Sequence, residues 1–571
     1  MNCSSLVRTA LPIRFLFVLP ALGLFLPEAR ATQPVSDRKA MVVAQEPLAA
    51  DVGLEVLKSG GNAVDAAVAV GFAMSVTYPY AGNIGGGGFM LIRLADGRTT
   101  FIDFREKAPG AASHDMYLDA GGQRMDSTVG WRSSGVPGTV RGFQLANAKY
   151  GTKPWAELIQ PAIRLASNGF PISRWQMESF HISKKLLDYP DSKRIFLKDG
   201  AFYDWQEILR QPELARTLGR IALNADDFYT GETAQLLAKA MKANGGLITL
   251  LDLANYRAVE RRPLEGDYKG YHIITAPPPS SGGICLLQML GMLDGTGYET
   301  NGAGSAASYH YEAEVMRRAF ADRSEYLGDR DFVTVPVSAM LNADYLSKRR
   351  ASIEPTHATP SAALKPGVFE SNEGTNTTHF SILDEQGNAV AVTYTLNLDY
   401  GSGITVPGAG FLLNDEMDDF ATAPGTTNVF GIMQGEKNAV APNKRPVSSM
   451  TPTIVLKDNR PYLILGAPGG PTIITAVLQV MLNVIDFHMN VQDAVDFPRI
   501  HQMWNPRPDQ DILAVERGIS PDTIAALEAM GHKINAARPV VVARVEAIMV
   551  NTNGWVEGAH DGRGIGKAVG Y

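Results

Sequence analysis

A change of hydrophobic period near residue 377 constrains the fold of this 571-residue chain more than any other feature. From there, apolar residues recur at alternate positions, and residues 377–383 and 389–396 are rich in β-branched side chains. The turn sequence Asp-Glu-Gln-Gly-Asn at 384–388 joins them, which is typical of an antiparallel hairpin. In that pairing Thr377 and Thr395 lie on adjacent strands, where one hydroxyl can hydrogen-bond the other.

The hydroxyl of Thr377 becomes a nucleophile only if a base takes its proton. The nearest base is the residue's own α-amine, which exists only after the Asn376–Thr377 peptide bond is cut. The same hydroxyl could first attack the Asn376 carbonyl, so that cleavage and catalysis share one nucleophile. From these residues alone, a strand threonine that is never cut remains the alternative.

The part of the chain before residue 377 is predicted to be helix-rich, and segments with period two follow from residue 377 onward. Residues 63–76 are apolar on all sides with small side chains, which predicts a helix buried between layers. Strands flanked by helical layers permit a four-layer αββα sandwich, although this pattern does not single it out. The expected helices are 47–57, 63–76, 155–168, 233–243, 305–326, 472–486 and 520–530, with 155–168, 233–243 and 305–326 amphipathic, and the further strands are 453–457, 461–466 and 543–551.

The composition predicts one compact globular unit. Hydrophobic residues make up 45% of the chain and charged residues 19%, which allows a large core, and no Pro/Gly/Ser-rich linker divides the sequence. The formal net charge is −7, and no cluster of Lys or Arg overrides it. We therefore expect small substrates and no nucleic-acid partner.

Residues 1–31 have the organisation of a secretory signal peptide. Arg8 and Arg14 supply the positive region, residues 15–26 are apolar, and residues 29–31 form a small-residue cleavage site. Because the apolar run is shorter than the roughly 20 residues that cross a bilayer, we expect its removal and no stable membrane anchor. The exported protein would be periplasmic or secreted and begin near Thr32.

Cysteines and glycine runs give no sign of redox or cofactor chemistry. Cys3 leaves with the signal, so Cys285 is the one cysteine left and we expect no intramolecular disulfide. The apolar helical surroundings of Cys285 predict a buried, inert thiol. The glycine runs at 85–88 and 562–567 lack the spacing of phosphate-binding loops, and neither H-E-x-x-H nor C-x-x-C occurs. We expect no cofactor and no catalytic metal.

Several short blocks occur together in one order, at residues 60–67, 83–90, 103–106, 376–383, 414–420, 442–450, 466–470 and 568–571. In this order they resemble the γ-glutamyltranspeptidases, which are N-terminal nucleophile hydrolases. The resemblance implies an α/β fold, the four-layer αββα sandwich, and self-cleavage between Asn376 and Thr377. Residues 32–376 would form a large subunit and residues 377–571 a small one, which stay associated as a heterodimer in one compact unit.

The resemblance also implies the catalytic residues. Thr377 would be the nucleophile, the hydroxyl of Thr395 would polarise it, and the N–H groups of Gly469 and Gly470 would bind the oxyanion. Without the resemblance, strand packing explains Thr395 and a simple strand-to-helix turn explains the two glycines.

A γ-glutamyl group carries an α-carboxylate and an α-ammonium, so a selective pocket needs a cationic fork and a group of acceptors. Taken singly, Arg105 could instead form an ion pair with Asp103 or Glu106, and Asp419 could be a turn carboxylate. The carboxylate ligands that the resemblance implies are Arg105, Ser448 and Ser449. The ammonium ligands that it implies are Asn397, Glu416 and Asp419.

Residues 421–431 form a polar stretch with Gly and Pro that resembles the lid loop of the family. Some members lack this loop. Bacterial relatives often have tyrosine where this chain has Phe430, which keeps an aromatic wall but lacks one hydroxyl donor.

The resemblance therefore implies a γ-glutamyltransferase and glutathione hydrolase. It would take the γ-glutamyl group from glutathione or related amides onto Thr377 and pass it to water, an amino acid or a peptide. A cephalosporin (glutaryl) acylase-like amidase is a second interpretation, against which the three ammonium ligands argue, because a glutaryl group lacks the α-amine. An uncleaved, non-catalytic binding protein of the same fold is a third.

Overall fold

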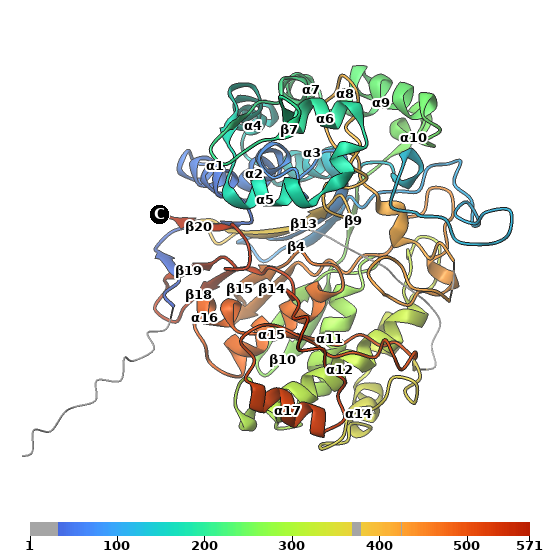
Figure 1. Ribbon diagram of the computed structural model, residues 1–571. Helices are drawn as coiled ribbons and strands as arrows, with labels where there is room; N and C mark the ends of the chain where they lie inside the picture. Colours follow the sequence, from blue (N-terminus) through green and yellow to red (C-terminus); the bar gives the residue numbers. More distant parts are fainter. Residues whose placement is uncertain (1–31, 368–377, 424) are drawn as a thin grey trace, which may run out of the picture. The chain divides into compact units, whose positions relative to one another are not determined.

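Two antiparallel sheets lie face to face between two helical layers (Figure 1). This computed structural model describes residues 32–367, 378–423 and 425–571. In this part of the chain each large sheet has seven strands, and every neighbouring pair is antiparallel. The α/β four-layer αββα architecture predicted from the resemblance is confirmed.

The strands of the two sheets come from distant parts of the sequence. The first sheet contains, in spatial order, β20 (Lys567–Gly570), β2 (Met41–Ala44), β12 (Thr378–Leu383), β13 (Ala389–Thr395), β3 (Gly87–Arg93), β4 (Thr99–Asp103) and β9 (Val259–Arg261). The second contains β1 (Val35–Asp37), β19 (Val556–Ala559), β18 (Glu546–Val550), β15 (Arg460–Gly466), β14 (Thr453–Lys457), β11 (Tyr271–Thr275) and β10 (Leu264–Tyr268). Two-stranded pairs are β5 (Phe170–Pro171) with β8 (Ile208–Leu209), β6 (Leu197–Lys198) with β7 (Ala201–Phe202), and β16 (Ile500–His501) with β17 (Ala514–Val515).

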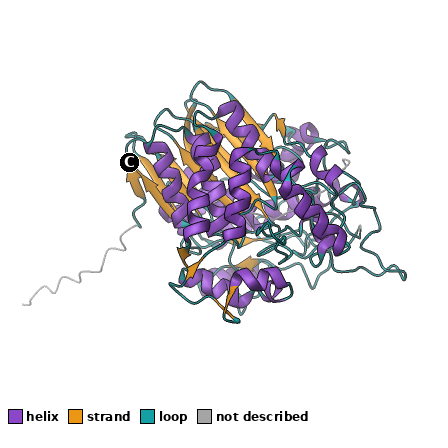
Figure 2. Cartoon of the chain, turned by 90° about the horizontal axis from the view of Figure 1, so that it is seen from above, coloured by secondary structure: helices purple, strands orange, loops and turns teal. Residues whose placement is uncertain are grey.

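One helical layer covers each outer face of the two sheets, and Figure 2 shows helices lying across one such face. The layer on the first sheet contains α1 (Pro47–Lys58), α2 (Ala63–Thr77), α3 (Thr139–Tyr150), α4 (Trp155–Asn168), α5 (Arg174–Ile182), α6 (Pro190–Phe196), α7 (Pro212–Leu223), α8 (Asp227–Thr230), α9 (Glu232–Ala243) and α10 (Leu250–Asn255). The other layer contains α11 (Gly282–Leu293), α12 (Ala306–Tyr326), α13 (Val337–Met340), α14 (Ala343–Ala351), α15 (Thr472–Ile485), α16 (Val491–Asp496) and α17 (Pro521–Ala529).

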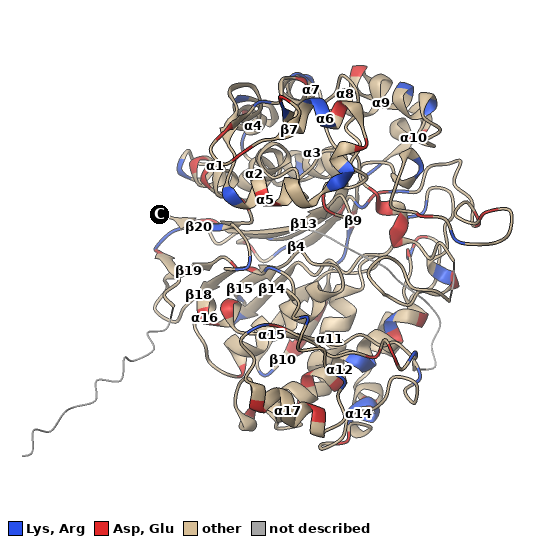
Figure 3. Ribbon diagram, in the orientation of Figure 1, with Lys and Arg blue, Asp and Glu red and all other residues tan. Residues whose placement is uncertain are grey.

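Alternation along the strands separates the core into layers. On β3, Phe89 and Leu91 face the second sheet, whereas Met90 and Ile92 face the helices. On β15, Ile464 packs between the sheets, and its neighbours in sequence pack against the other helical layer. Lys, Arg, Asp and Glu are concentrated on the helices and loops around this apolar centre (Figure 3).

The predicted hairpin is confirmed. β12 and β13 pair from Thr378 opposite Tyr394 to Leu383 opposite Ala389. The predicted strands at 453–457 and 461–466 and the predicted helices occur within one or two residues of their expected bounds. The strand expected at 543–551 is shorter and begins at Glu546, because the positive φ of Ala543 (62°) is incompatible with an extended strand.

Two expectations about burial have different outcomes. Every residue of α2 is buried, as its small apolar side chains predicted, and an Asn62/Asp65 capping box closes its first turn. The amphipathic expectation for 305–326 is wrong, because α12 also buries most of its charged residues. Glu314 pairs with Arg317 and Arg318, and these ion pairs make the burial tolerable.

Each sheet contains strands from both sides of residue 377. Strand β3, for example, lies between β13 and β4, and it was not expected because its whole sequence is buried and lacks period-two alternation. The helix-rich description of the first part was therefore incomplete. The two parts of the chain interlock throughout the sandwich.

Candidate active site

The end of the hairpin of β12 and β13 is in contact with the backbone segment 83–86. The main-chain carbonyl of Thr395 accepts a hydrogen bond of 2.7 Å from the Asn83 side chain. A Cβ on Gly86 would lie 1.9 Å from this carbonyl, so only glycine allows the segment 83–86 to approach. The Thr395 hydroxyl accepts the N–H of Asn397 at 2.7 Å, which leaves its own O–H as a donor.

Asn376 and Thr377, the predicted cleavage pair, lie outside the described residues. The description resumes at Thr378, whose buried hydroxyl has no hydrogen-bond partner within residues 32–367, 378–423 and 425–571. The next residue, His379, is anchored between the sheets by Thr393 and Ser381, each 2.9 Å from a ring nitrogen. Burial lowers the pKa of His379 to about 3, so this ring is neutral and serves to hold β12.

Arg105 lies at the centre of a fully buried ionic cluster. It follows β4, and its guanidinium contacts Glu416 and, at 2.5 Å, Asp419. Both carboxylates project from a short 3₁₀ turn at Glu416–Asp419. Glu106 is farther away, at 3.4 Å. The alternative pairing with Glu106 is thus a weak contact, and the main partners are two residues expected to bind the opposite end of the substrate.

The backbone completes the coordination of this guanidinium. Nε of Arg105 donates to the Pro446 carbonyl at 3.2 Å, and Nη2 donates to the Val447 carbonyl at 3.1 Å. Asp103 accepts the backbone N–H of Arg105 and pairs through its side chain with Arg261 at 2.7 Å. The Arg105 fork is therefore fixed in direction by both charge and backbone contacts.

Three predicted ammonium ligands share an unusual property. Within the described part of the chain, one buried side-chain oxygen of each has no hydrogen-bond donor. Unsatisfied buried acceptors are costly and point to a ligand that carries donors. These atoms are Oδ1 of Asn397, Oε2 of Glu416 and Oδ1 of Asp419.

The electrostatics of the cluster favour an additional cation. Burial raises the pKa values of Glu416 and Asp419 well above normal, although the Arg105 charge opposes this. Burial likewise raises the pKa of Glu106 to about 7. One guanidinium cannot balance three ionised carboxylates, so burial favours their protonated forms. A bound ammonium group would supply the missing positive charge and favour the ionised forms.

Backbone contacts of Asn397 and Asn414 hold the three predicted ammonium ligands in place. Asn397 has a positive φ of 77°, a conformation that asparagine tolerates, and its amide donates to the Asp415 carbonyl at 2.9 Å. Asn414 accepts the N–H groups of Gly135 and Glu416. Sequence reasoning did not assign a role to Asn83 or Asn414, although both lie within the quoted blocks.

Ser448 and Ser449 are fully buried in the segment that follows the Arg105 contacts. The Ser448 hydroxyl accepts the Met450 N–H at 3.2 Å. The Ser449 hydroxyl accepts a bond of 3.1 Å from Arg323 on α12. A second buried arginine therefore adjoins the predicted carboxylate ligands. No local sequence pattern could predict this contact, because it spans 126 residues.

Gly469 and Gly470 form the turn between β15 and α15, with φ values of 137° and 61°. Both conformations favour glycine. A Cβ on Gly469 would meet the Thr472 hydroxyl oxygen at 2.7 Å and Cα of Ala543 at 2.8 Å. The turn is thus packed tightly against the segment that leads into β18.

The predicted lid is tied to the ionic cluster through Asp418. Its carboxylate accepts the N–H of Val429 at 3.2 Å and binds Arg124 at 3.0 Å. Asp419 contributes its main-chain carbonyl, which accepts from Gln434 at 3.1 Å. Phe430, half-buried, lines a cavity of about 580 Å³ together with Asn397.

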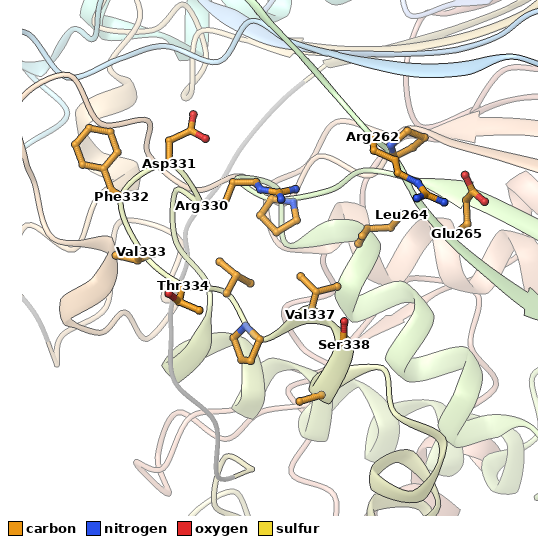
Figure 4. Close-up of a pocket in the computed structure, with 15 residues that line it drawn as sticks. Arg262, Leu264, Glu265, Arg330, Asp331, Phe332, Val333, Thr334, Val337 and Ser338 are labelled. Carbon is orange, nitrogen blue, oxygen red and sulfur yellow. The ribbon is translucent and has the colours of Figure 1, made fainter.

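A larger cavity, of about 1020 Å³, lies elsewhere. Figure 4 shows its lining side chains, among them Arg262, Arg330 and Phe332. None of the residues predicted for catalysis or substrate binding lines it. Size alone therefore does not locate the chemistry, whereas the buried ionic cluster does.

The described residues contain no group of three or more His, Cys, Asp or Glu side chains that could hold a metal ion. Nor does any helix among residues 32–367, 378–423 and 425–571 have the length and apolarity needed to cross a membrane. Cys285 lies fully buried in α11, as its apolar surroundings predicted.

Comparison with known sequences decides the family. Residues 49–571 match the sequence model described as Gamma-glutamyltranspeptidase. The chain belongs to the γ-glutamyltranspeptidase family. It is 50% identical over 533 residues to the glutathione hydrolase proenzyme of Pseudomonas sp. strain A14, with 92% of each chain covered. It is 48% identical over 537 residues to that of Escherichia coli strain K12, covering 93% of this chain and 92% of the relative.

Solved structures agree with the fold of this γ-glutamyltranspeptidase family member. The cephalosporin acylase from Bacillus halodurans superimposes with a TM-score of 0.82 at 28% identity, covering 95% of this chain and 98% of that chain. Its higher divergence, compared with the glutathione hydrolase proenzymes, disfavours the acylase interpretation.

Proposed function

We propose that this protein is a γ-glutamyltransferase and glutathione hydrolase that acts through an N-terminal Thr377. The observation that carries the proposal is the buried set of unsatisfied acceptors on Asn397, Glu416 and Asp419 beside the Arg105 guanidinium. This arrangement complements the zwitterionic end of a γ-glutamyl group. The names of the related glutathione hydrolase proenzymes support the same substrate class.

Binding of the zwitterion divides the buried ionic cluster of Arg105, Glu416 and Asp419 into two ion pairs. Its α-carboxylate takes over part of the Arg105 fork, with Ser448 and Ser449 as further donors. Its α-ammonium binds Glu416, Asp419 and the amide oxygen of Asn397. A glutaryl group carries only the carboxylate, so the carboxylates displaced from Arg105 would stay unpaired, and the site should select against it.

The register of the hairpin supports the nucleophile. Thr378, the residue after the expected nucleophile, pairs with Tyr394, the residue before Thr395. The Thr395 hydroxyl oxygen accepts the N–H of Asn397, and its own O–H then donates to the Thr377 hydroxyl. After cleavage the α-amine of Thr377 takes the proton as Oγ attacks the γ-carbonyl carbon. The N–H groups of Gly469 and Gly470 stabilise the oxyanion.

Maturation follows from the same nucleophile. Thr377 attacks the Asn376 carbonyl carbon, the peptide nitrogen becomes the new α-amine, and water hydrolyses the ester. We propose a large subunit of residues 32–376 and a small subunit of residues 377–571 that remain a heterodimer. The interleaving of strands from both parts in each sheet supports their continued association. Export through the signal at 1–31 would place the enzyme in the periplasm or outside the cell.

One assay tests this function. The purified protein is incubated with γ-glutamyl-p-nitroanilide or glutaryl-p-nitroanilide, with and without a dipeptide acceptor, and its chains are weighed by mass spectrometry. We expect two chains, release of nitroaniline from the γ-glutamyl substrate, and stimulation by the acceptor. A single chain without activity would support the binding-protein alternative, and preference for the glutaryl substrate would support an acylase.

A further inference from the structure

The cavity of about 580 Å³ borders two parts of the candidate active site. One part of its wall is the segment 397–399, which begins two residues after the end of β13. Another part is Arg544, two residues before β18. The cavity therefore lies beside an expected ammonium ligand and is bordered by the segment that leads into β18 of the second sheet.

The Arg544 segment packs against the expected oxyanion turn. The N–H of Arg544 donates to the Pro468 carbonyl at 3.3 Å. The preceding residue, Ala543, is so close that a Cβ on Gly469 would lie 2.8 Å from its Cα. A molecule held in the cavity would consequently lie next to the turn that is expected to bind the oxyanion.

The walls of this cavity have two kinds of chemistry. The aromatic side chains Tyr80 and Trp175 meet edge to face at 4.9 Å between ring centroids, and Phe430 adds a third ring. The Arg544 guanidinium carbon lies 5.8 Å from the Trp175 ring centroid, and its Nε is fixed by the Arg563 carbonyl at 3.1 Å. An aromatic surface beside an oriented guanidinium is suited to a ligand that carries an apolar side chain next to a carboxylate.

The other charged residues that line the cavity limit the ligands that it can bind. Lys185 is already bound to Asp415 at 3.1 Å. Glu178 and Asp399 also line the cavity and would repel an acidic side chain. Lys184 also lines the cavity, but Arg544 is the cation that lies over one of its aromatic rings. This arrangement suits a ligand with one carboxylate beside an apolar group.

We propose that this cavity is the subsite for the acceptor: an α-amino acid or short peptide with a free carboxylate and an aromatic or apolar side chain. Arg544 binds the carboxylate, and Trp175 and Phe430 contact the side chain. The acceptor's amine nitrogen attacks the ester carbon on Thr377, a C–N bond forms, and the C–Oγ bond breaks. The amine proton passes through the Thr377 α-amine to Oγ. This assignment rests on the proposed transferase function.

The same subsite serves the peptide released from the donor. Its departing amine leaves from the position at which the acceptor amine attacks, because the second step retraces the geometry of the first. A donor such as glutathione therefore places its terminal carboxylate near Arg544, whereas an anilide donor has no carboxylate to place there.

The test compares acceptors within one preparation. With γ-glutamyl-p-nitroanilide as donor, kcat/KM is measured for L-phenylalanine and for L-phenylalaninamide, which lacks the carboxylate. Loss of a charged hydrogen bond corresponds to about ten- to a hundredfold, so Arg544→Gln should lower the acid-to-amide ratio by at least about tenfold. Because both values come from the same sample, incomplete maturation cancels. An unchanged ratio overturns the assignment.

Two further variants and one wild-type measurement complete the test. Arg174→Gln removes a neighbouring positive charge that lies over Trp205, outside this cavity, and should keep the wild-type ratio. Trp175→Ala should reduce transfer to phenylalanine relative to glycine, which keeps the proposal testable if Arg544→Gln does not fold. Wild-type enzyme should use glutamate less efficiently than phenylalanine, and equal use would contradict the acidic wall.

The two proposals fail in different ways. Wild-type protein that releases no nitroaniline from the γ-glutamyl substrate would refute the enzyme function itself. Active wild-type enzyme whose acceptor preferences are insensitive to Arg544 and Trp175 would refute only the acceptor subsite.

Discussion

The guanidinium of Arg105 lies 2.5 Å from the carboxylate of Asp419, and both side chains are fully buried. The contact joins residues 314 positions apart in the sequence. It brings the expected ligands of the two charged ends of a γ-glutamyl group into direct contact. A bound zwitterion therefore has to compete with this ion pair, and only a ligand with both charges compensates both partners.

Replacing Asp419 tests this relationship. Asp419→Asn should lower kcat/KM for γ-glutamyl-p-nitroanilide and spare or improve that for glutaryl-p-nitroanilide, because the ammonium loses its ion-pair partner. Only preparations shown by mass to be fully cleaved are compared. Asp331→Asn, an exposed partner of Arg261, is the control and should leave the substrate ratio unchanged. An equal loss on both substrates would contradict the role of Asp419.

Arg105→Lys keeps the charge but cannot reproduce the fork. An ammonium cannot contact Glu416, Asp419 and the two carbonyls of Pro446 and Val447 in this geometry. We expect a fall in γ-glutamyl kcat/KM of about one to two decades, which corresponds to about 1.5–3 kcal/mol for a charged hydrogen bond.

The control for Arg105 is Arg261, which is not among the expected substrate ligands. Arg261→Lys changes a guanidinium that pairs with Asp103 and Asp331 and not with the predicted ammonium ligands. It should affect thermal stability more than substrate recognition. Wild-type kinetics in a fully cleaved Arg105→Lys enzyme would remove Arg105 from the site.

Cleavage should depend on Thr377 and not on its neighbour. Thr377→Ala should stay a single chain, whereas Thr377→Ser keeps a hydroxyl and should still be cut. Thr378→Ala is the matched control, because it removes the adjacent threonine hydroxyl and should still give chains of 32–376 and 377–571. Intact mass after purification distinguishes these outcomes. Correct cleavage in Thr377→Ala would show that another group performs it.

Gly469→Ala should damage catalysis through displacement of the turn. The added Cβ would lie 2.8 Å from Cα of Ala543. The alanine would also have to adopt a φ of 137°, which L-residues rarely do. Loss of an oxyanion donor costs about 10²–10³ in kcat, so a fall of that order is expected. Gly297→Ala also has a positive φ, of 70°, but no atom lies within 4 Å of its Cβ. Gly297→Ala should therefore lose stability and keep kcat. Equal losses of kcat in the two variants would argue against the oxyanion role of Gly469.

Glu312 should make stability fall as pH rises. It is buried in α12, and its Oε2 has no partner in the described part of the chain. Burial, with a contribution from Asp486, raises its pKa from 4.5 to about 8. Between these values the folded state keeps the proton and the unfolded state loses it, so this group lowers stability progressively from about pH 4.5 to pH 8.

Glu312→Gln removes this titration. The Tm difference, variant minus wild type, should therefore increase between pH 5 and pH 8, whatever its absolute value. Thermal melts at several pH values measure it directly. A pH-independent difference would show that Glu312 is ionised in the folded protein.

Local sequence determined the elements of this protein. The alternation in 389–396, the small apolar residues of 63–76 and the turn signal at 384–388 each act over a few residues, and the corresponding strand, helix and hairpin formed. The blocks in family order identified the fold and the candidate site residues through resemblance. Strand β3 was missed because burial on both faces removes the alternation that marks a strand.

Tertiary structure decided which of these elements meet. Arg105 faces Glu416 and Asp419, Ser449 meets Arg323, and Arg544 packs beside the Gly469 turn, each across a long stretch of chain. Periodicity records which face of an element is apolar, but it carries no information on its distant partner. The buried acceptors without donors became visible only once the folded backbone had brought these carboxylates together and excluded water from them.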